Sequence, residues 1–550
     1  MAKPSRYTRE EIEKYVAKGF WKTTISNMWD RNANEYANKA AIEDLRTTLT
    51  WAGAKQWTDR MALNLLELGI KRDDVIVVQL PNCNELNLFR VASEKAGVLC
   101  IPVIANMREK EMEYILRYTD ARAVVIPWNH RRFDHFGMIE SMRSVLPKLE
   151  HVLVVDDKVP DGALSVARLA NEPLGQRYTE TSYLEERRYK PTETSIINLT
   201  TGTTGFPKFA EYPAAANAAW GEGQSPFLRL TLADIVAAIA PAARGPTLPV
   251  YYDAPWVGAK AVMLQWNGPE EALRAIEAKK VTVACLVPTQ LAMMMEQFKI
   301  GSYDLSSIRV WYSAGALMPP SLLKEVEERI GGTVVIDYGL VDFGGLIVQD
   351  FEDPQGLRMH TVGKPRFGTE IMIVDEDGKA AKIGNVGEIL GRGPTCSSGY
   401  YKDPKATSES WNKDGWFAMG DLGKIDEQGN LSVVGRKKDM IIRGGQNIYP
   451  SEIENLLITH PKILEVAIVA MPDPVMGEKA CAYVVLRTGE SLILEEMTAF
   501  LREKNIASFK IPERLEIIDR LPVVSGQKVD KKSLGQDIAK KLSNEKEDGE

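Results

Sequence analysis

Between about Thr50 and Ile336 the sequence alternates short apolar runs with longer segments whose apolar residues recur at helical spacing. Trp57–Leu68 has the helical spacing and ends at Gly69, and Val75–Leu80 then forms a β-branched run that stops at Pro81. Similar apolar runs recur at Val98–Ile104, Ala123–Pro127, His151–Val155, Val281–Val287, Ile308–Tyr312 and Thr333–Ile336. This alternation predicts βαβ units around a mostly parallel sheet, which is the α/β fold class.

After about Gly368 the sequence pattern changes to shorter strand-like runs separated by tight-turn residues. DEDG at 375–378 and DEQGN at 426–430 are typical of hairpin turns, so we expect a β-rich subdomain here. A charged junction at Arg436–Asp439 precedes a compact α+β segment that ends near Leu534, and we expect Asn544–Glu550 to be frayed. We therefore place a large N-terminal domain at 1–437 and a small C-terminal domain at 438–550.

Composition argues against several classes of protein. The 550 residues carry 68 Lys and Arg against 75 Asp and Glu, whereas nucleic-acid-binding surfaces usually show a basic surplus. The five cysteines form no C-x-x-C pair and the five histidines no H-E-x-x-H motif, so disulfides and a histidine-rich metal site are not expected. No signal-peptide core and no apolar stretch near the ~20 residues that span a bilayer is evident. We expect a cytoplasmic monomer or homodimer without nucleic-acid or membrane partners.

The most informative segment is a run of threonines and glycines that ends in a lysine. It reads TTGTTGFPK and consists of Thr200, Thr201, Gly202, Thr203, Thr204, Gly205, Phe206, Pro207 and Lys208. Its glycines permit a close approach to an anion, and its hydroxyls, backbone N–H groups and lysine can surround phosphate oxygens. The spacing does not fit the G-x-x-x-x-G-K-[ST] motif, and a generic segment of this composition is more often a flexible surface loop.

This segment resembles the phosphate loop of the acyl-adenylate-forming superfamily, which includes acyl-CoA synthetases, aryl-acid–AMP ligases, peptide-synthetase adenylation domains and luciferases. Further motifs of that family follow in its order: Gly387–Ile389 with Gly399–Tyr401 and Pro404–Thr407, WFAMGD at 416–421, and GRKKDMIIRGGQNIYPSEIE at 435–454. The resemblance extends roughly from Leu80 to Lys532. It implies a large ATP- and acid-binding domain, a mobile C-terminal domain, and activation of a carboxylic acid by ATP.

The resemblance implies a nucleotide site assembled from several segments. Asp421 would accept hydrogen bonds from both ribose hydroxyls, and Arg436 would contact the ribose or a phosphate. Adenine would stack on the small-residue loop that includes Gly315 and Ala316. Without the resemblance, Asp421 reads as a turn cap and Arg436 as a solvated charge.

The hexapeptide DYGLVD at 337–342 stands where the family has Y-G-x-T-E. The residues assigned here to the nucleotide site are Asp337, Tyr338, Gly339, Val341 and Asp342. By resemblance Tyr338 would cover adenine, and Asp342 would take a catalytic role by binding Mg²⁺, a hard cation suited to carboxylate oxygen. The sequence departs from the family twice, because aspartate replaces glutamate and Val341 replaces a hydroxyl residue that meets the α-phosphate.

The C-terminal segments imply two half-reactions. Lys528 lies in LPVVSGQKV at 521–529, which resembles the loop that carries the catalytic adenylation lysine, with Gln527 in place of a glycine. Lys438 matches the residue whose backbone rotates between half-reactions. Gly444 and Gly445 match the glycines that let pantetheine reach the adenylate, so the resemblance implies coenzyme A as the acceptor.

The acid-binding region departs most from the family. Phe209 replaces a glycine after the phosphate loop, Arg244 falls where relatives have histidine, and Gly245 falls where aryl-acid ligases often have asparagine. By position Arg244 and Gly245 would contact the substrate, and Arg244 could neutralise its carboxylate. A structural ion pair is an equal alternative for Arg244.

We therefore expect an AMP-forming acid–CoA ligase that uses ATP, Mg²⁺ and coenzyme A to activate a small aromatic or alicyclic acid. Two alternatives remain open. The first is an aryl-acid–AMP ligase that loads a separate carrier protein. The second is a non-catalytic nucleotide-binding relative, which the departures at Phe209, Arg244, Val341 and Gln527 would favour.

Overall fold

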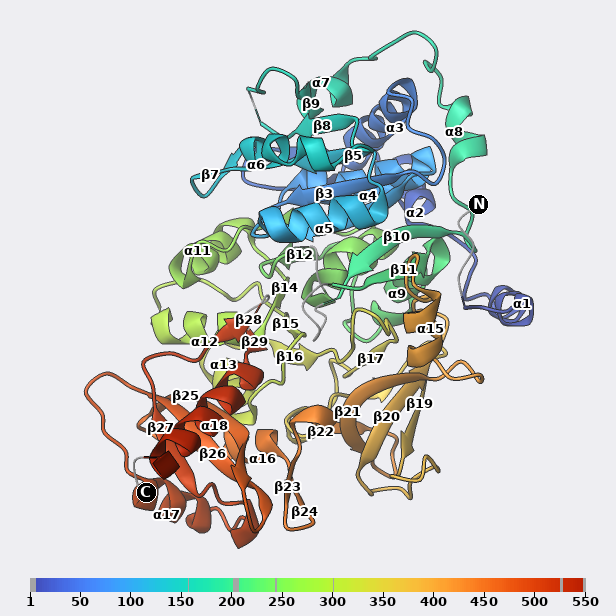
Figure 1. The fold of residues 1–550 in the computed structure, drawn as a ribbon. Helices are drawn as coiled ribbons and strands as arrows, with labels where there is room; N and C mark the ends of the chain where they lie inside the picture. The colour runs from blue at the N-terminus through green and yellow to red at the C-terminus, as the bar shows by residue number, and fades with distance from the viewer. Residues whose placement is uncertain are drawn as a thin grey trace.

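Two seven-stranded sheets form most of the N-terminal region (Figure 1). The computed structural model describes residues 6–156, 158–200, 207–242, 245–299, 301–524 and 528–547. The first sheet, in the upper half of Figure 1, has the strand order β11-β10-β4-β3-β5-β8-β9. Its strands are β3 (Val75–Leu80), β4 (Leu99–Ile104), β5 (Ala123–Ile126), β8 (His151–Val154), β9 (Leu164–Ser165), β10 (Thr194–Leu199) and β11 (Phe209–Pro213).

The second sheet has the strand order β16-β15-β14-β12-β13-β1-β2. Its strands are β1 (Ala40–Glu43), β2 (Thr48–Thr50), β12 (Ile235–Ala238), β13 (Lys260–Met263), β14 (Val283–Leu286), β15 (Val310–Ser313) and β16 (Thr333–Ile336). In both sheets every pairing is parallel except that of the last strand at one edge, β10 with β11 and β1 with β2. Loops at the carboxyl ends of such strands are where ligand sites form in open α/β sheets.

Helices connect and cover the strands, and they begin and end at residues with recognisable caps. Helix α3 begins at Trp51 because the Thr50 hydroxyl accepts a hydrogen bond from the Gly53 N–H at 3.1 Å, and it ends before Gly69, which has φ +78°. The helices of this region are α1 (Arg9–Ala17), α2 (Ile25–Glu35), α3 (Trp51–Glu67), α4 (Asn84–Ala96), α5 (Glu109–Thr119), α6 (His135–Ser141), α7 (Val166–Asn171), α8 (Ser182–Arg187), α9 (Ala214–Gln224), α10 (Ala254–Val257), α11 (Pro269–Lys279), α12 (Pro288–Gln297), α13 (Pro320–Arg329), α14 (Gln355–Arg358) and α15 (Pro404–Ser410).

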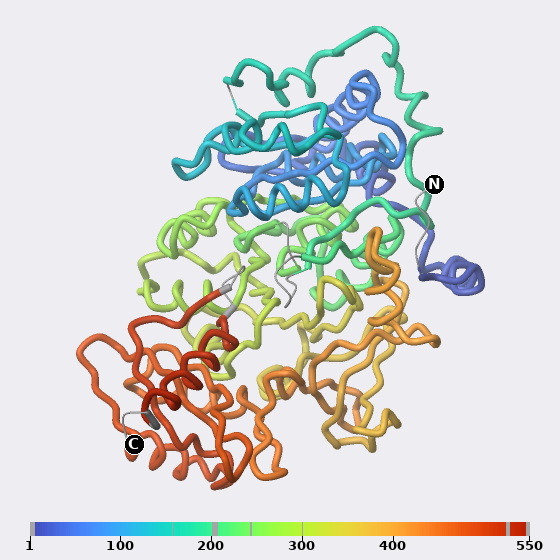
Figure 2. Tube along the Cα trace, in the orientation of Figure 1, coloured from blue at the N-terminus to red at the C-terminus, as the bar shows by residue number. Residues whose placement is uncertain are grey.

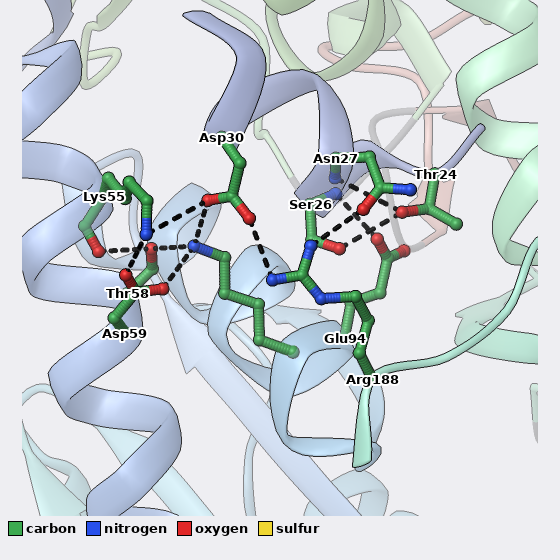
Figure 3. A network of polar contacts seen from close by, with 10 residues as sticks. Thr24, Ser26, Asn27, Asp30, Lys55, Thr58, Asp59, Glu94 and Arg188 are labelled. Carbon is green, nitrogen blue, oxygen red and sulfur yellow. Dashed lines mark hydrogen bonds and ion pairs between the residues drawn. The ribbon is translucent and has the colours of Figure 1, made fainter. Parts of the chain in front are cut away.

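A buried ionic network joins α2, α3 and α4 (Figure 3). The Lys95 side chain is fully buried, and its ammonium lies 2.7 Å from Asp30 Oδ1 and 2.6 Å from Asp59 Oδ1. Thr58 accepts a third hydrogen bond from it at 3.1 Å, and Arg188 pairs with the other Asp30 oxygen at 2.8 Å. The network therefore fixes three helices relative to one another through charges that are paired inside the protein.

An antiparallel sheet follows, as the turn clusters predict. Its order is β19-β20-β21-β22, and in the turn between β21 and β22 the Asp426 carboxylate accepts hydrogen bonds from the N–H groups of Gln428 and Asn430. The strands here are β17 (Ile347–Val348), β18 (Lys364–Pro365), β19 (Glu370–Val374), β20 (Gly387–Arg392), β21 (Phe417–Ile425) and β22 (Leu431–Arg436); a small separate hairpin consists of β6 (Asn129–His130) and β7 (Phe133–Asp134).

The C-terminal elements surround hydrophobic clusters of their own, and Figure 2 shows this part of the chain grouped beside the rest. They are β23 (Ile441–Arg443), β24 (Gln446–Ile448), β25 (Ile463–Asp473), β26 (Gly477–Leu486), β27 (Arg514–Ile517), β28 (Val523–Val524), β29 (Lys528–Val529), α16 (Pro450–Leu457), α17 (Leu494–Glu503) and α18 (Lys531–Glu547). At the junction the Ser451 hydroxyl of α16 donates to the Val434 carbonyl of β22.

The predicted α/β class, the β-rich region and the C-terminal α+β region are confirmed, and β3 and β16 have the predicted bounds. The expectation of fraying from Asn544 is wrong for residues 544–547, because α18 continues to Glu547 and the Arg514 guanidinium binds Glu545 at 2.6 Å. Within the described residues, no helix combines the length and apolarity needed to cross a membrane.

Candidate active site

The phosphate segment connects the antiparallel pair β10 and β11. The Thr200 N–H donates to the Lys208 carbonyl at 3.0 Å, and the Lys208 N–H donates to Thr200 Oγ1 at 3.3 Å, so the two ends of the segment are held together. The residues between them that we assigned to phosphate binding, Thr201, Gly202, Thr203, Thr204 and Gly205, lie outside the described residues. The structure thus anchors the predicted loop at the end of a buried strand.

Tyr400 links the end of this segment to Asp342. The Lys208 ammonium lies 4.6 Å from the centre of the Tyr400 ring, and the Tyr400 hydroxyl donates to Asp342 Oδ2 at 2.8 Å. Burial, followed by the nearby Asp342 carboxylate, raises the pKa of Tyr400, which therefore stays a neutral hydrogen-bond donor. Two residues that are distant in sequence and were predicted to act on phosphate and metal are thereby brought to one place.

The backbone around Asp342 is held from two sides. The Ser397 hydroxyl donates to the Asp342 carbonyl at 2.5 Å, and the Tyr212 hydroxyl donates to the Val341 carbonyl. Gly344 has φ +71°, and a Cβ at this position would lie 2.3 Å from the Tyr212 hydroxyl oxygen, so only glycine fits there. The chain thus presents Asp342 from a constrained loop.

Asp421 contacts Tyr338 and Arg436. The Tyr338 hydroxyl donates to Asp421 Oδ2 at 2.6 Å, and the Arg436 Nε lies 3.0 Å from Asp421 Oδ1. The two charged residues are cross-strand partners in β21 and β22, which explains their proximity. Asp421, Tyr338 and Arg436 therefore meet, as expected for residues that bind one nucleotide.

Small residues of two strand-end loops lie close to the segment predicted to bind the acid. Gly315, Ala316 and Gly339 are exposed, and Asp337 donates its backbone N–H to the Ser313 carbonyl at 3.0 Å. Gly315 has φ +86°, and a Cβ there would lie 3.2 Å from Pro246 Cγ. The expected adenine loop thus lies next to residues 245–247, which form the short helix η2 (Gly245–Thr247).

The departures from the family pattern at Phe209 and Gly245 can be compared with the structure. Phe209 is buried in β11 and stacks on the Tyr118 ring at 4.8 Å between centres, so its side chain belongs to the hydrophobic core. Arg244 and Gln527 lie outside the described residues, and Gly245 is half-buried at the start of η2. The buried position of Phe209 removes one of the reasons for suspecting a non-catalytic protein.

The junction residues lie in the C-terminal part of the molecule, next to β22. Lys438 is exposed in the short helix η4 (Lys437–Asp439), which follows Arg436 directly. Gly444 and Gly445 form the turn between β23 and β24 with φ +55° and +81°, and the Gly444 N–H donates to the Met476 carbonyl at 2.8 Å. Both positive φ values explain why glycine occupies these positions.

Lys528 begins β29, and its backbone pairs with Val524 of β28. Its side chain lies outside the described part of the chain, so its predicted contact with substrate stays a prediction. Sequence reasoning missed the linking role of Tyr400, although the motif Gly399–Tyr401 was recognised. It also missed Tyr212 and Ser397, which carry no motif that marks them as supports of the Asp342 loop.

Asp342 fits a magnesium ion bound together with nucleotide phosphates. Mg²⁺ is usually held by one or two carboxylates, with phosphate and water oxygens completing its coordination. One Asp342 oxygen is already oriented by Tyr400. In the described ranges no group of three or more His, Cys, Asp or Glu side chains is arranged to hold a metal by itself.

The fold and these clustered residues define an adenylate-forming enzyme. Two models of known protein families match this chain. The family of AMP-binding enzymes matches residues 29–401, and the AMP-binding enzyme C-terminal domain matches residues 452–528. The chain therefore belongs to the AMP-binding enzyme family.

Relatives and solved structures cover nearly the whole chain. The medium-chain fatty-acid–CoA ligase of Escherichia coli strain K12 is 29% identical over 536 residues, which cover 96% of this chain and 93% of that enzyme. The 2,3-dihydroxybenzoate-AMP ligase of Bacillus subtilis strain 168 is 29% identical and covers 97% of both chains. The structure of the anthranilate CoA ligase AuaEII with anthranoyl-AMP has a TM-score of 0.84 at 24% identity, covering 95% of this chain and 98% of that one.

Proposed function

We propose that this protein is an AMP-forming acid–CoA ligase that activates a small aromatic or alicyclic carboxylic acid. The observation that carries the proposal is the link from Lys208 through Tyr400 to Asp342, which joins the end of the phosphate segment to the proposed Mg²⁺ ligand. The cluster of Asp421 with Tyr338 and Arg436 supports a nucleotide site. Relatives that are named as CoA ligases and as AMP ligases support the chemistry.

In the first half-reaction a carboxylate oxygen of the acid attacks the α-phosphorus of ATP, and the bond to the β-phosphate oxygen breaks. The products are the acyl-adenylate and pyrophosphate. This step depends on alignment and on neutralisation of phosphate charge more than on an acid–base pair. Lys208 and Lys528 would supply positive charge, and Asp342 would hold the Mg²⁺ ion that screens the phosphates.

In the second half-reaction the sulfur of coenzyme A attacks the acyl carbonyl, and the bond to the AMP oxygen breaks. The thiol proton is lost to solvent, and the thioester and AMP are released. We place this step at the turn of Gly444 and Gly445, because glycine has no side chain in the way of pantetheine. Lys438 would allow the C-terminal domain, residues 438–550, to turn between the two steps.

The acceptor of the acyl group and the cellular compartment of the protein are further parts of the same proposal. A separate carrier protein in place of coenzyme A is the second candidate, because the dihydroxybenzoate relative is named as an AMP ligase. The five cysteines are all free and buried, which favours a reducing compartment such as the cytoplasm. Measuring transfer to free coenzyme A separates the two acceptors.

The half-reactions can be tested separately with Lys528→Ala. We expect acid-dependent pyrophosphate release to slow by about two orders of magnitude or more, because a charge that acts only in the adenylation transition state is lost. Thioester formation from supplied acyl-adenylate should keep most of its rate. Equal losses in both steps would contradict the role given to Lys528, and no acid-dependent pyrophosphate release by the unmodified protein would overturn the proposed function.

A further inference from the structure

Asp253 is a buried carboxylate that the proposed chemistry leaves without a role. It is the last residue of the π-helix η3 (Pro249–Asp253), which begins two residues after η2 in the segment predicted to bind the acid. Its side chain is fully buried, and within the described chain neither carboxylate oxygen has a hydrogen-bond partner. Buried carboxylates without partners are costly and rare, and single-turn π-helices are frequent at functional sites.

Asp253 interacts electrostatically with residues at the carboxyl ends of three neighbouring strands of the second sheet. Its charge interacts with Cys285 of β14, with Tyr312 of β15 and with Asp337, which follows β16 directly. Asp337 is itself buried and lies next to Tyr338 of the nucleotide cluster. The two carboxylates therefore lie at the edge of the sheet where the loops of the site meet.

Apart from the Tyr312 hydroxyl, which donates to Asp337, the groups around the two carboxylates offer acceptor atoms without matching donors. Asp337 Oδ1 and Gln224 Oε1 are also buried without a hydrogen-bond partner among the described residues. The amide nitrogen of Gln224 is already used, because it donates to the Tyr312 hydroxyl at 3.2 Å. Burial raises the pKa of Asp337 to about 7, and burial with the nearby Asp337 raises that of Asp253, as expected where two acids share a site without a cation.

We infer that the acid activated by this protein carries an amino group, whose N–H donors bind between Asp253 and Asp337. The inference rests on the proposed function, and it names the class of substrate. The geometry supports it because Asp253 follows η2 on the same segment, and η2 lies beside the exposed loop of Gly315. One end of the substrate would then reach the adenylate site, and its amino group would complete the unpaired acceptors.

The amino group belongs to an aromatic or an alicyclic acid, and both supply N–H donors. An acid with a methyl group in that place would leave the two carboxylates unpaired when it binds. Discrimination of this kind is strong, because the apolar compound makes no hydrogen bond to these buried carboxyl groups and gains nothing in return. The test therefore compares acids that differ only in this group.

The experiment measures kcat/KM for pyrophosphate release with matched pairs of acids. The aromatic pairs are the three aminobenzoates and the corresponding methylbenzoates, and the alicyclic pairs are aminocyclohexanecarboxylic acids and the corresponding methylcyclohexanecarboxylic acids. We expect at least one amino compound to exceed its methyl partner by about tenfold or more, and the pair that does so identifies the source of the amino group. Asp253→Asn should bring that ratio close to unity, because asparagine keeps the shape but replaces one acceptor oxygen by an N–H donor.

Asp337→Asn serves as the second variant, and it should lower the same ratio. The exposed turn residue Asp377 provides the control, because Asp377→Asn should keep the ratio of the unmodified protein. Activation of methyl compounds with rejection of every amino partner would overturn this inference and leave the proposed function intact. A preference that both buried-site variants retain would also overturn it, as expected if the carboxylates held only a structural cation. Failure to activate any acid would overturn the proposed function and this inference together.

Discussion

At the scale of single residues, one hydroxyl group orients the side-chain carboxylate of Asp342, the proposed metal ligand. Tyr400 donates to Asp342 Oδ2 at 2.8 Å, and its ring lies under the Lys208 ammonium. The hydroxyl orients the carboxylate, whereas the ring alone makes the cation–π contact. The two contributions can therefore be separated by removing the hydroxyl only.

Tyr400→Phe should raise the KM for MgATP by about 3- to 10-fold, which corresponds to the loss of one hydrogen bond of about 1 kcal/mol. The Lys208 contact should remain because phenylalanine keeps the ring. Pyrophosphate release as a function of MgATP concentration gives this value, and Tyr401→Phe at the next position is the control. If the two variants have the same KM as the unmodified protein, Tyr400 does not orient Asp342.

The buried acid pair predicts an unusual dependence of stability on pH. Burial raises the pKa of Asp337 to about 7, partly offset by the Tyr312 hydroxyl, whereas the unfolded chain has an aspartate pKa of about 3.9. The folded state thus binds the proton more tightly, so stability falls as the pH rises from about 4 to about 7 and then levels off. The other titratable groups that face this site are Asp253 and Cys285.

Asp337→Asn should therefore stabilise the ligand-free protein at about pH 8, by about 1–4 kcal/mol, and change its stability little at about pH 4. Urea unfolding at both pH values measures the difference. The gain is expected because residues that bind a ligand charge are destabilising while the site is empty. A variant that is less stable at both pH values would indicate that Asp337 has a structural role.

The sequence predicted the site role of some of these residues and not of others, and this difference has a physical cause. Tyr338, Asp421 and Arg436 lie in ordered motifs, so their meeting could be predicted from resemblance and is seen in their contacts. Asp253 has no motif, and only the folded chain shows that it is buried opposite Asp337. Burial and pairing depend on neighbours distant in sequence, which one local pattern does not contain.

At the scale of elements, the strands were predictable and the ends of some helices were not. The predicted bounds of β3 are correct because its six residues form one continuous run, and all six are buried. No helical spacing of apolar residues competes with this run. α3 begins six residues before the predicted start, because Thr50 caps it and the apolar spacing of its first turn is weak. The polar end of α18 is helical because an ion pair with Arg514 fixes Glu545, a contact that polarity alone does not predict.

The network of Figure 3 allows a matched comparison of two lysines that bind the same aspartates. The side chain of Lys95 is 0% exposed and that of Lys55 is 33% exposed, and both pair with Asp30 and Asp59. Lys95→Met should lower the free energy of unfolding by about 3–5 kcal/mol, because it leaves buried carboxylates unpaired. Lys55→Met should cost about 1 kcal/mol or less, as for a partly exposed pair.

Denaturant unfolding at neutral pH measures both changes. Burial raises the pKa of Asp30, but Lys95 more than offsets this, and the net pKa is lowered. The contribution of Asp30 is therefore present above the unfolded pKa of about 3.9 and is lost as the pH falls further. Equal losses from the two lysine substitutions would contradict the distinction between the buried and the partly exposed charge.

At the scale of the whole molecule, the chain is divided by a short junction. Residues on one side form the two large sheets and the antiparallel sheet, and residues on the other side form their own hydrophobic clusters. η4 joins them directly after Arg436, which contacts Asp421 of the nucleotide cluster. A rotation about Lys438 would therefore move the C-terminal loops relative to the site without disturbing either core.

The proposed function requires this one chain to form an acyl-adenylate and then to pass the acyl group to a thiol. The most direct measurement is a single-turnover experiment with a panel of small acids, in which pyrophosphate, AMP and acyl-CoA are followed separately. We expect acid-dependent pyrophosphate release without coenzyme A, and acyl-CoA and AMP when coenzyme A is added. Lys438→Pro should lose only the second step, because proline fixes φ near −65°. Binding of ATP with no acid-dependent pyrophosphate release for any acid would contradict the proposed function.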